Sequence, residues 1–93
     1  MPLSDDEKAL LSLVAEATAP VAMSEFFETI NPPAPGLNEH HPDHPAWTER
    51  QIALYGASVQ LWQQGLVRVV TPADGSRPDL VEATDTGHAV LAG

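Results

Sequence analysis

The stretch LWQQGLVRVVTPADGSRPDLVEATDTGHAVLA, residues 61–92, decides the fold because its residue pattern changes from helix to hairpin and back to helix. Gly65 is well placed to end the first helical segment in the left-handed conformation. The β-branched run LVRVV then predicts a strand, TPADGSRPD predicts a turn-rich loop, and LVEAT predicts a returning strand. The last segment, TDTGHAVLA, predicts a short helix capped by Thr84 or Asp85.

Two further helices and a strand are predicted before this stretch begins. The run SDDE is a capping box, in which Ser4 and Glu7 satisfy each other's backbone N–H groups, and it predicts a helix from Ser4 to about Ala17. The short segment PVAM indicates an edge strand. Ser24 is then expected to cap a second helix, SEFFETI, which the two following prolines end.

A proline-rich connection at residues 31–46 leads into a long third helix. This connection contains five prolines and three of the four histidines. Asp43 is expected to cap the third helix, with Thr48 and Gln51 as an alternative capping box. The helix is predicted to run to about Gln64.

The hairpin region resembles that of MarR-type regulators in the winged helix-turn-helix superfamily. In that family a Leu-x-x-x-Gly-Leu-Val motif ends the third helix, as residues 61–67 do here. An Asp and an Arg stand near the tip of the wing, where this chain has Asp74 and Arg77. A Thr-x-x-Gly turn opens the last helix, matched by Thr84 and Gly87.

The resemblance covers Leu61 to Leu91 closely and the rest of the chain by the order of its elements. It implies an α+β fold, a single winged helix-turn-helix domain over residues 1–93 with about four helices and a two- or three-stranded antiparallel wing. It also implies a DNA-binding transcriptional regulator whose third helix enters the major groove. Under that hypothesis the DNA-contacting candidates are Arg50, Gln51 and Arg77.

The charge of the chain favours other functions. Its only cations are Lys8, Arg50, Arg68 and Arg77, against 13 carboxylates, and the formal net charge is −9. Nucleic-acid affinity comes largely from Lys and Arg that neutralise phosphates, and anionic membranes attract the same residues. We therefore expect neither DNA nor membrane to bind, and expect a protein partner that is itself basic, or self-association. An acidic mimic that occupies a nucleic-acid-binding protein is a further hypothesis.

Composition also bears on location and on catalysis. The chain has no cysteine, which fits a reducing compartment. No run approaches the roughly 18 apolar residues that would span a membrane, and the acidic start MPLSDDEKALL is unlike a signal peptide. We expect a cytoplasmic location. The sequence contains no recognisable catalytic motif and no Gly-rich phosphate loop, so neither enzymatic activity nor a cofactor is predicted.

Three histidines cluster in GLNEHHPDHPAW, residues 36–47. As metal ligands, His40, His41 and His44 would join Glu39 or Asp43, and imidazole with carboxylate suits zinc or nickel. Adjacent His40 and His41 tend to point apart, however, and the flanking prolines limit adjustment, so no metal site is predicted. The favoured interpretation is a proline-stiffened loop, and acid sensitivity of the histidines is an alternative.

The third helix is predicted to have two apolar faces. Counting back from Gly65 places Leu54, Ala57 and Leu61 toward the core. The other face is expected to bind a partner through Trp47, Ile52, Tyr55, Val59 and Trp62. A helix that is apolar on two faces is buried twice, and burial of the second face under the long loop is the alternative. The sequence therefore predicts a protein–protein interaction module, such as an adaptor, an inhibitor or an assembly subunit.

Overall fold

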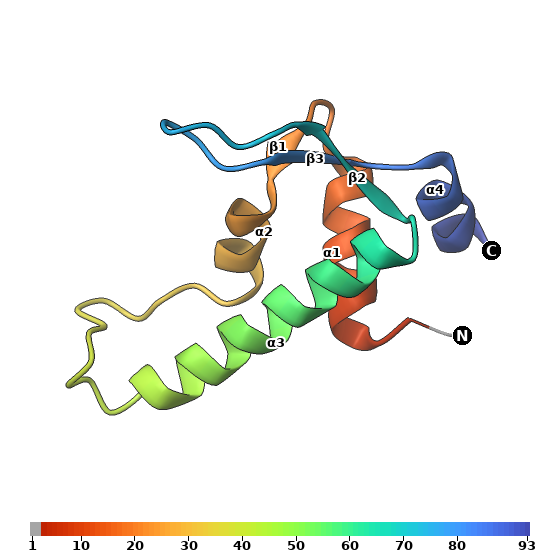
Figure 1. Ribbon diagram of the computed structural model, residues 1–93. Coiled ribbons are helices and arrows are strands. Elements are labelled where there is room, and N and C mark those ends of the chain that lie inside the picture. The colour runs from red at the N-terminus through yellow and green to blue at the C-terminus, as the bar shows by residue number, and fades with distance from the viewer. Residues whose placement is uncertain (1–2) are drawn as a thin grey trace.

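The computed structural model describes residues 3–93, which form four helices and a three-stranded antiparallel sheet (Figure 1). Residues 1 and 2 of the expected domain lie outside this range. The elements in chain order are α1 (Asp5–Glu16), β1 (Val21–Ala22), α2 (Met23–Ile30), α3 (His44–Gln63), β2 (Val67–Thr71), β3 (Leu80–Ala83) and α4 (Asp85–Ala92). This confirms the predicted α+β class with a winged-helix-like layout. Within the described range, no helix is both long and apolar enough to cross a bilayer.

The first helix begins as its sequence predicts. The Ser4 hydroxyl accepts a hydrogen bond from the Glu7 N–H at 3.2 Å, and the Glu7 carboxylate accepts one from the Ser4 N–H at 3.2 Å. The helix then ends at Glu16, close to the predicted Ala17.

The start of α2 differs from the prediction. The helix begins at Met23, so Ser24 lies in its first turn, and the N-cap residue Ala22 makes no side-chain hydrogen bond. The prediction that Ser24 caps α2 is therefore wrong. The reason is that β1 pairs with β3 over only Val21 and Ala22, and the chain passes from the strand directly into the helix.

The third helix begins earlier than expected, at His44, so the connection spans residues 31–43. Pro45 lies in the first turn, where its missing N–H would have had no partner within the helix. The prolines that were expected to keep residues 44–46 in the loop are thus compatible with the helix start.

Neither predicted side-chain cap of α3 forms. Asp43 occupies the N-cap position, but its backbone is already helical, with φ −87° and ψ −6°, and its side chain makes no capping hydrogen bond. Thr48 lies inside the helix, where its buried hydroxyl has no hydrogen-bond partner among the described residues. Gln51 instead accepts a hydrogen bond from Asn31 at 3.1 Å.

The third helix ends at Gln63, close to the predicted Gln64, and Gly65 follows its C-cap in the left-handed conformation as predicted. Gly65 has φ +74°, the left-handed region that glycine adopts most easily. The Leu66 N–H donates to the Leu61 carbonyl at 2.9 Å, and the Gly65 N–H donates to the Trp62 carbonyl at 3.0 Å. This pair of bonds is the Schellman motif, and it satisfies carbonyl groups that the helix end would otherwise leave unpaired.

The start of α4 is attached to that turn. The Thr84 hydroxyl accepts from the Gly87 N–H at 3.0 Å and donates to the Gly65 carbonyl at 2.6 Å. The Thr84 N–H donates to the Leu66 carbonyl at 3.0 Å. A Cβ added at Gly87 would overlap that carbonyl oxygen and lie 3.3 Å from Leu11 Cδ1. The Thr-x-x-Gly sequence therefore has a packing reason, since α4 approaches the turn too closely for any side chain.

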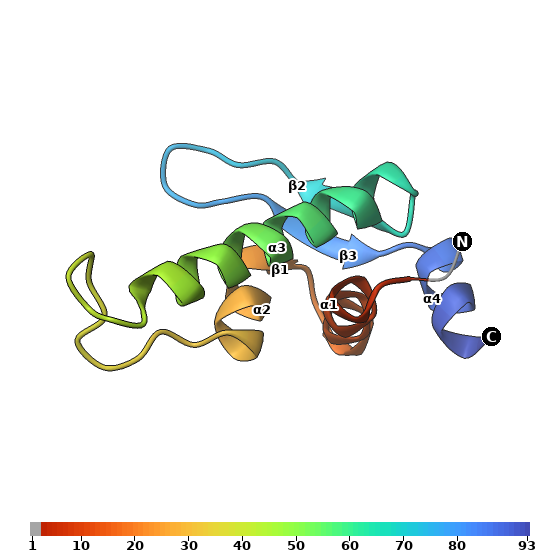
Figure 2. The same ribbon diagram turned by 90° about the horizontal axis from the view of Figure 1, so that it is seen from below.

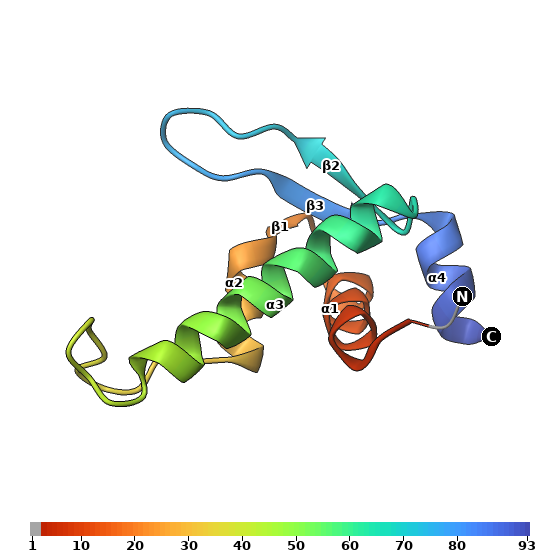
Figure 3. The ribbon, with the colours of Figure 1, turned by 60° about the horizontal axis from the view of Figure 1, so that its bottom comes forward.

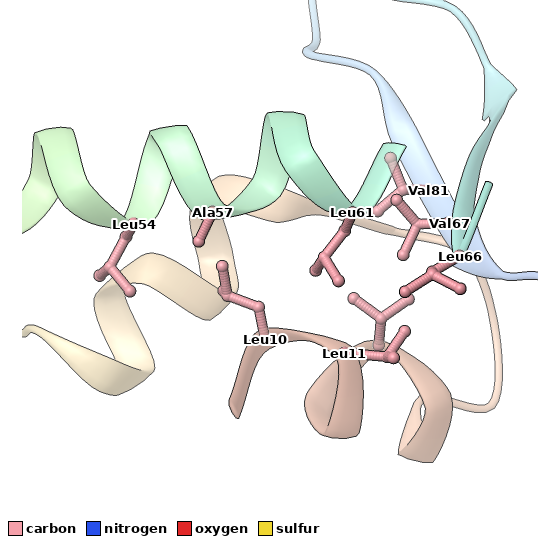
Figure 4. Close-up of a cluster of buried hydrophobic side chains, with 9 residues drawn as sticks. Leu10, Leu11, Leu54, Ala57, Leu61, Leu66, Val67 and Val81 are labelled. Carbon is pink, nitrogen blue, oxygen red and sulfur yellow. The ribbon is translucent and has the colours of Figure 1, made fainter. Parts of the chain in front are cut away.

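The core lies between α1, α3 and the start of the hairpin. Leu54, Ala57 and Leu61 of α3 face the core as predicted, and Leu10 of α1 points toward them, whereas Leu11 points toward Leu66 (Figure 4). The remaining buried members of the cluster are Val14, Leu66, Val67 and Val81. Figure 2 shows α1 end-on, with α2 and α4 to either side of it and with α3 and the sheet above it in this view.

The sheet has the order β1-β3-β2, so β3 is central. Val69 of β2 lies opposite Val81 of β3, and the pairing shifts between Val69 and Thr71. Beyond this irregularity the hairpin loop projects toward the same side of the molecule as the first half of α3 (Figure 3). The hairpin and α3 thus form two walls of the surface described next.

Candidate functional site

The second apolar face of α3 is exposed. Ile52, Tyr55 and Trp62 are 66%, 64% and 59% exposed, whereas Leu54 and Leu61, on the opposite side of the same helix, are fully buried. Val59, which shares the exposed side by helical spacing, is half-buried. The long loop therefore leaves most of this face open to solvent.

A groove of about 450 Å³ runs beside this face. We call it the α3 groove. Its walls come from three places: α2 (Met23, Ser24 and Phe27), α3 (Tyr55, Ser58, Val59 and Trp62) and the hairpin (Val67, Val69, Pro78, Asp79 and Val81). Most of these side chains are apolar, and the groove continues the inner face of the sheet outward from the core.

Two of the polar groups in the groove are already engaged. The Ser58 hydroxyl donates to the Tyr55 carbonyl at 2.7 Å. The Asp79 carboxylate accepts a hydrogen bond from the Ala73 N–H of the hairpin loop. The groove thus presents mainly apolar surface, with one carboxylate at the side of the hairpin.

Trp47 is separated from the other predicted partner-binding residues. It is half-buried, and its indole N–H donates to the Asn31 carbonyl at 3.1 Å. The Asn31 side-chain amide donates in turn to the Trp47 carbonyl at 3.2 Å. Pro32 and Leu37 of the loop line a small pocket with Trp47. The loop therefore packs on Trp47 and leaves Tyr55 and Trp62 open.

The clustered histidines, two in the loop and His44 at the start of α3, have local partners. The His41 Nδ1 accepts a hydrogen bond from the Asp43 N–H at 3.1 Å, and the His44 ring lies 6.3 Å from the Trp47 ring. The His40 Nε2 is 3.5 Å from a Glu39 carboxylate oxygen. Within residues 3–93, no three His, Asp or Glu side chains gather in a way that could hold a metal ion.

All three arginines are paired within the chain. Arg50 Nη1 lies 2.6 Å from Asp6 Oδ1, so this α3 side chain reaches toward α1. Arg77 lies 3.4 Å from Asp74 and also donates to the Pro72 carbonyl. Arg68 of β2 is bound by Glu82 of β3. Gln51 accepts a hydrogen bond from the Asn31 side chain. Each of the three DNA-contacting candidates, Arg50, Gln51 and Arg77, therefore contacts another group of the protein.

The tip of the hairpin is organised around Asp74. Its carboxylate accepts hydrogen bonds from the Ser76 hydroxyl and from the N–H groups of Ser76 and Arg77. These bonds, the one from the Ser76 side chain first, hold the pKa of Asp74 below its ordinary value. The carboxylate stays ionised and keeps Arg77 close to the hairpin.

Two walls of the α3 groove were not predicted from the sequence. Met23 and Phe27 are one helical turn apart in α2, so their spacing could have indicated a shared face. Val67 and Val69 alternate along β2 and therefore point to one side of the sheet. What the sequence lacks is the angle at which α2 and the hairpin meet α3, and that angle creates the groove.

Comparison of the chain with protein-family models, with curated proteins and with solved structures finds no match.

Proposed function

We propose that this chain is a non-catalytic protein-interaction module of winged-helix layout that acts in the cytoplasm as an adaptor, an inhibitor or an assembly subunit. Its binding surface is the exposed face of α3 together with the α3 groove. One observation carries the proposal: Ile52, Tyr55 and Trp62 are each about three-fifths exposed or more on one side of one helix. Large aromatic side chains on an open surface are the usual anchors of protein interfaces.

The size of this surface supports a specific role. A fully covered Trp or Tyr side chain buries about 150–250 Å², so the exposed parts of Tyr55 and Trp62 offer roughly 200–300 Å². Ile52 and the open side of the groove extend this area. Apolar patches of about 300–600 Å² are the largest found on typical monomers and are often functional. The surface is therefore large enough to form the apolar centre of an interface.

A MarR-like DNA-binding regulator is the second candidate, favoured by the winged-helix layout and by the hairpin motifs. The ion pairs of Arg50 and Arg77 weigh against it, because either side chain would have to leave a carboxylate of its own protein to reach a phosphate. The exposed stripe of α3, where the MarR resemblance places base-reading residues, carries apolar side chains instead. A protein partner would bury these apolar side chains without breaking either ion pair.

A comparative pull-down tests the proposal. The purified chain and a Tyr55→Ser/Trp62→Ser variant are immobilised and exposed to extract of the source organism, and captured proteins are quantified by mass spectrometry. We expect a small set of proteins, retained at stoichiometric level by the wild type, to fall at least tenfold with the variant, since hot-spot aromatics contribute a large part of binding energy.

The matched control is Val90→Ser, which removes an apolar side chain that is 44% exposed on α4, outside the α3 groove. This variant should capture the same proteins as the wild type. Circular dichroism must show that every variant is folded. Equal capture by the wild type and the folded double variant would place any binding elsewhere and would remove the proposed role of α3.

A further inference from the structure

We propose that the α3 groove binds a basic amphipathic α-helix of a partner protein. This inference rests on the proposed function and adds the chemistry and the secondary structure of the partner. It depends on three features of the groove, namely its backbone, its charge and its length.

The backbone of the groove favours a helix as the occupant. Its walls are side chains of two helices and of the inner face of the sheet, including Phe27, Trp62 and Val69. Along α3 the N–H and C=O groups are bonded within the helix, and Val67, Val69 and Val81 reach the groove with side chains from the face of the sheet. Free backbone groups in these walls are confined to the first turn of α2 and the outer edge of β2. An extended segment lying in this groove would bury its own N–H and C=O groups without partners, which costs free energy. A helix satisfies its backbone internally and presents only side chains to the groove.

The charge of the groove favours a basic occupant. Asp79 lies in its wall. Glu28 follows the groove residue Ser24 by one turn on α2, so helical spacing places its exposed carboxylate at the α2 edge. The arginines are held by carboxylates of their own chain, and Lys8 is not among the residues that line the groove. A cationic segment would therefore meet complementary charge on both sides of an apolar centre.

The length of the exposed stripe sets the size of the helix. From Ile52 to Trp62 the helix advances ten residues, or about 15 Å at 1.5 Å per residue. A partner helix of about ten residues would match this length, with apolar residues at positions i, i+3 or i+4, and i+7 facing the groove. Lys or Arg residues would flank that apolar stripe.

A second copy of this chain is the less favourable occupant. Two copies would bring together chains that each carry a net charge of −9, and the carboxylates at the groove edges would approach one another. Like charges placed across an interface are costly. Self-association through α3 is accordingly an outcome that would overturn the proposal.

Selection from unbiased peptides tests the inference. A display library of random 16-residue peptides is selected against the immobilised full-length chain at low salt. Enriched peptides are synthesised, their affinities are measured by fluorescence anisotropy, and their conformation is followed by circular dichroism. We expect the binders to carry more Lys and Arg than Asp and Glu, to gain helical signal on binding, and to lose at least tenfold in affinity for Tyr55→Ser/Trp62→Ser.

The contribution of the acidic side chains to binding is tested with variants that neutralise them. Glu28→Gln/Asp79→Asn should weaken binding by about two- to tenfold, since exposed ion pairs are individually weak. Glu16→Gln/Glu39→Gln changes the net charge equally but at exposed positions outside α2, α3 and the hairpin, so it should change affinity far less. Added salt should reduce binding of the wild type.

The outcomes separate the two proposals. Peptides that need Tyr55 and Trp62 but lack a cationic excess, or that bind as strands, would overturn the basic-helix inference while leaving the interaction surface in place. So would light scattering that shows a wild-type dimer which the double serine variant loses. Peptides that bind the folded double variant as tightly as the wild type, or no enriched peptides at all, would count against the groove as a docking site and against the function proposed for α3.

Discussion

Replacement of Trp62 by Ala is expected to lower the stability of the isolated chain only moderately. Trp62 is 59% exposed, so about two-fifths of its surface is buried. A Trp side chain buries up to about 150–250 Å², which gives roughly 60–100 Å² of buried surface at this position. At about 25 cal/mol per Å² the lost burial costs about 1.5–2.5 kcal/mol. The better helix propensity of Ala returns about 0.5 kcal/mol, which leaves a net loss of about 1–2 kcal/mol.

The matched comparison is Leu61→Ala, one residue earlier in the same helix. Leu61 is fully buried against α1, and Leu-to-Ala changes at such sites cost about 2–5 kcal/mol. Because small domains have total stabilities of about 5–15 kcal/mol, Leu61→Ala is expected to unfold partly or completely under conditions where Trp62→Ala stays folded. Two neighbouring substitutions should therefore differ clearly in stability.

Urea denaturation followed by circular dichroism at 222 nm provides the assay, because the far-ultraviolet signal depends little on which aromatic residues remain. The free energies of unfolding of wild type, Trp62→Ala, Tyr55→Ala and Leu61→Ala are compared, with light scattering of each. If Trp62→Ala and Tyr55→Ala destabilise as much as Leu61→Ala while the wild type is a monomer, then their side chains belong to the core. The reasoning that makes α3 an interaction surface would then fail.

Four further predictions concern two glycines, the pKa of Glu7, the removal of metal ions and the binding of DNA. Gly87→Ala should destabilise by about 1–3 kcal/mol or more in urea titrations, because its Cβ would overlap backbone, whereas Gly56→Ala, with open space around it in α3, should stabilise by about 0.5–1 kcal/mol. Burial acts to raise the pKa of Glu7, but hydrogen bonds from Gln64 and Ser4 outweigh it and lower that pKa below 4.5. The folded state therefore loses this stabilisation as pH falls through the lowered pKa, and Glu7→Gln should flatten the acid side of a stability–pH curve below pH 4.5; an unchanged curve would contradict the assignment. Chelation with EDTA should leave the melting temperature unchanged, since no three His, Asp or Glu side chains gather within the described residues; a fall restored by Zn²⁺ would contradict this. Duplex DNA should bind only weakly at about 0.15 M salt, because the arginines are already paired, and sub-micromolar binding by fluorescence anisotropy would restore the regulator hypothesis.

The elements that the sequence predicts well are those whose signals are local. The capping box at Ser4 and the left-handed residue Gly65 act through hydrogen bonds between residues three to five apart, so a short stretch of sequence contains the whole interaction. The core face of α3 also follows from spacing alone, since Leu54, Ala57 and Leu61 repeat at the helical period. These predictions hold in the structure.

The elements that failed depend on tertiary contacts. Ser24 is a good cap residue, but the pairing of Val21 with Val81, sixty residues away, sets where α2 begins. Thr48 and Gln51 match a capping box, yet the Gln51 side chain accepts a hydrogen bond from Asn31, which follows α2, and does not cap the helix. The same limit applies to the site: the sequence predicts the exposed stripe on α3 but not the groove, because the groove depends on how α2 and the hairpin are oriented.

The winged-helix-like layout and the side-chain chemistry of this chain favour different partners. The layout exposes one stripe of α3, which the MarR resemblance associates with reading DNA, but a fold does not by itself determine which molecule binds there. In this chain Arg50 turns from α3 toward Asp6 on α1, and Arg77 stays with Asp74 in the hairpin. Contact with a phosphate would exchange one exposed ion pair for another, and the chain offers four cations against 13 carboxylates with which to hold a nucleic acid. The stripe that remains carries Tyr55 and Trp62, which gain only from a partner that removes them from water. We therefore propose that this exposed position in the fold binds a protein surface, and the net charge of −9 favours one of positive charge.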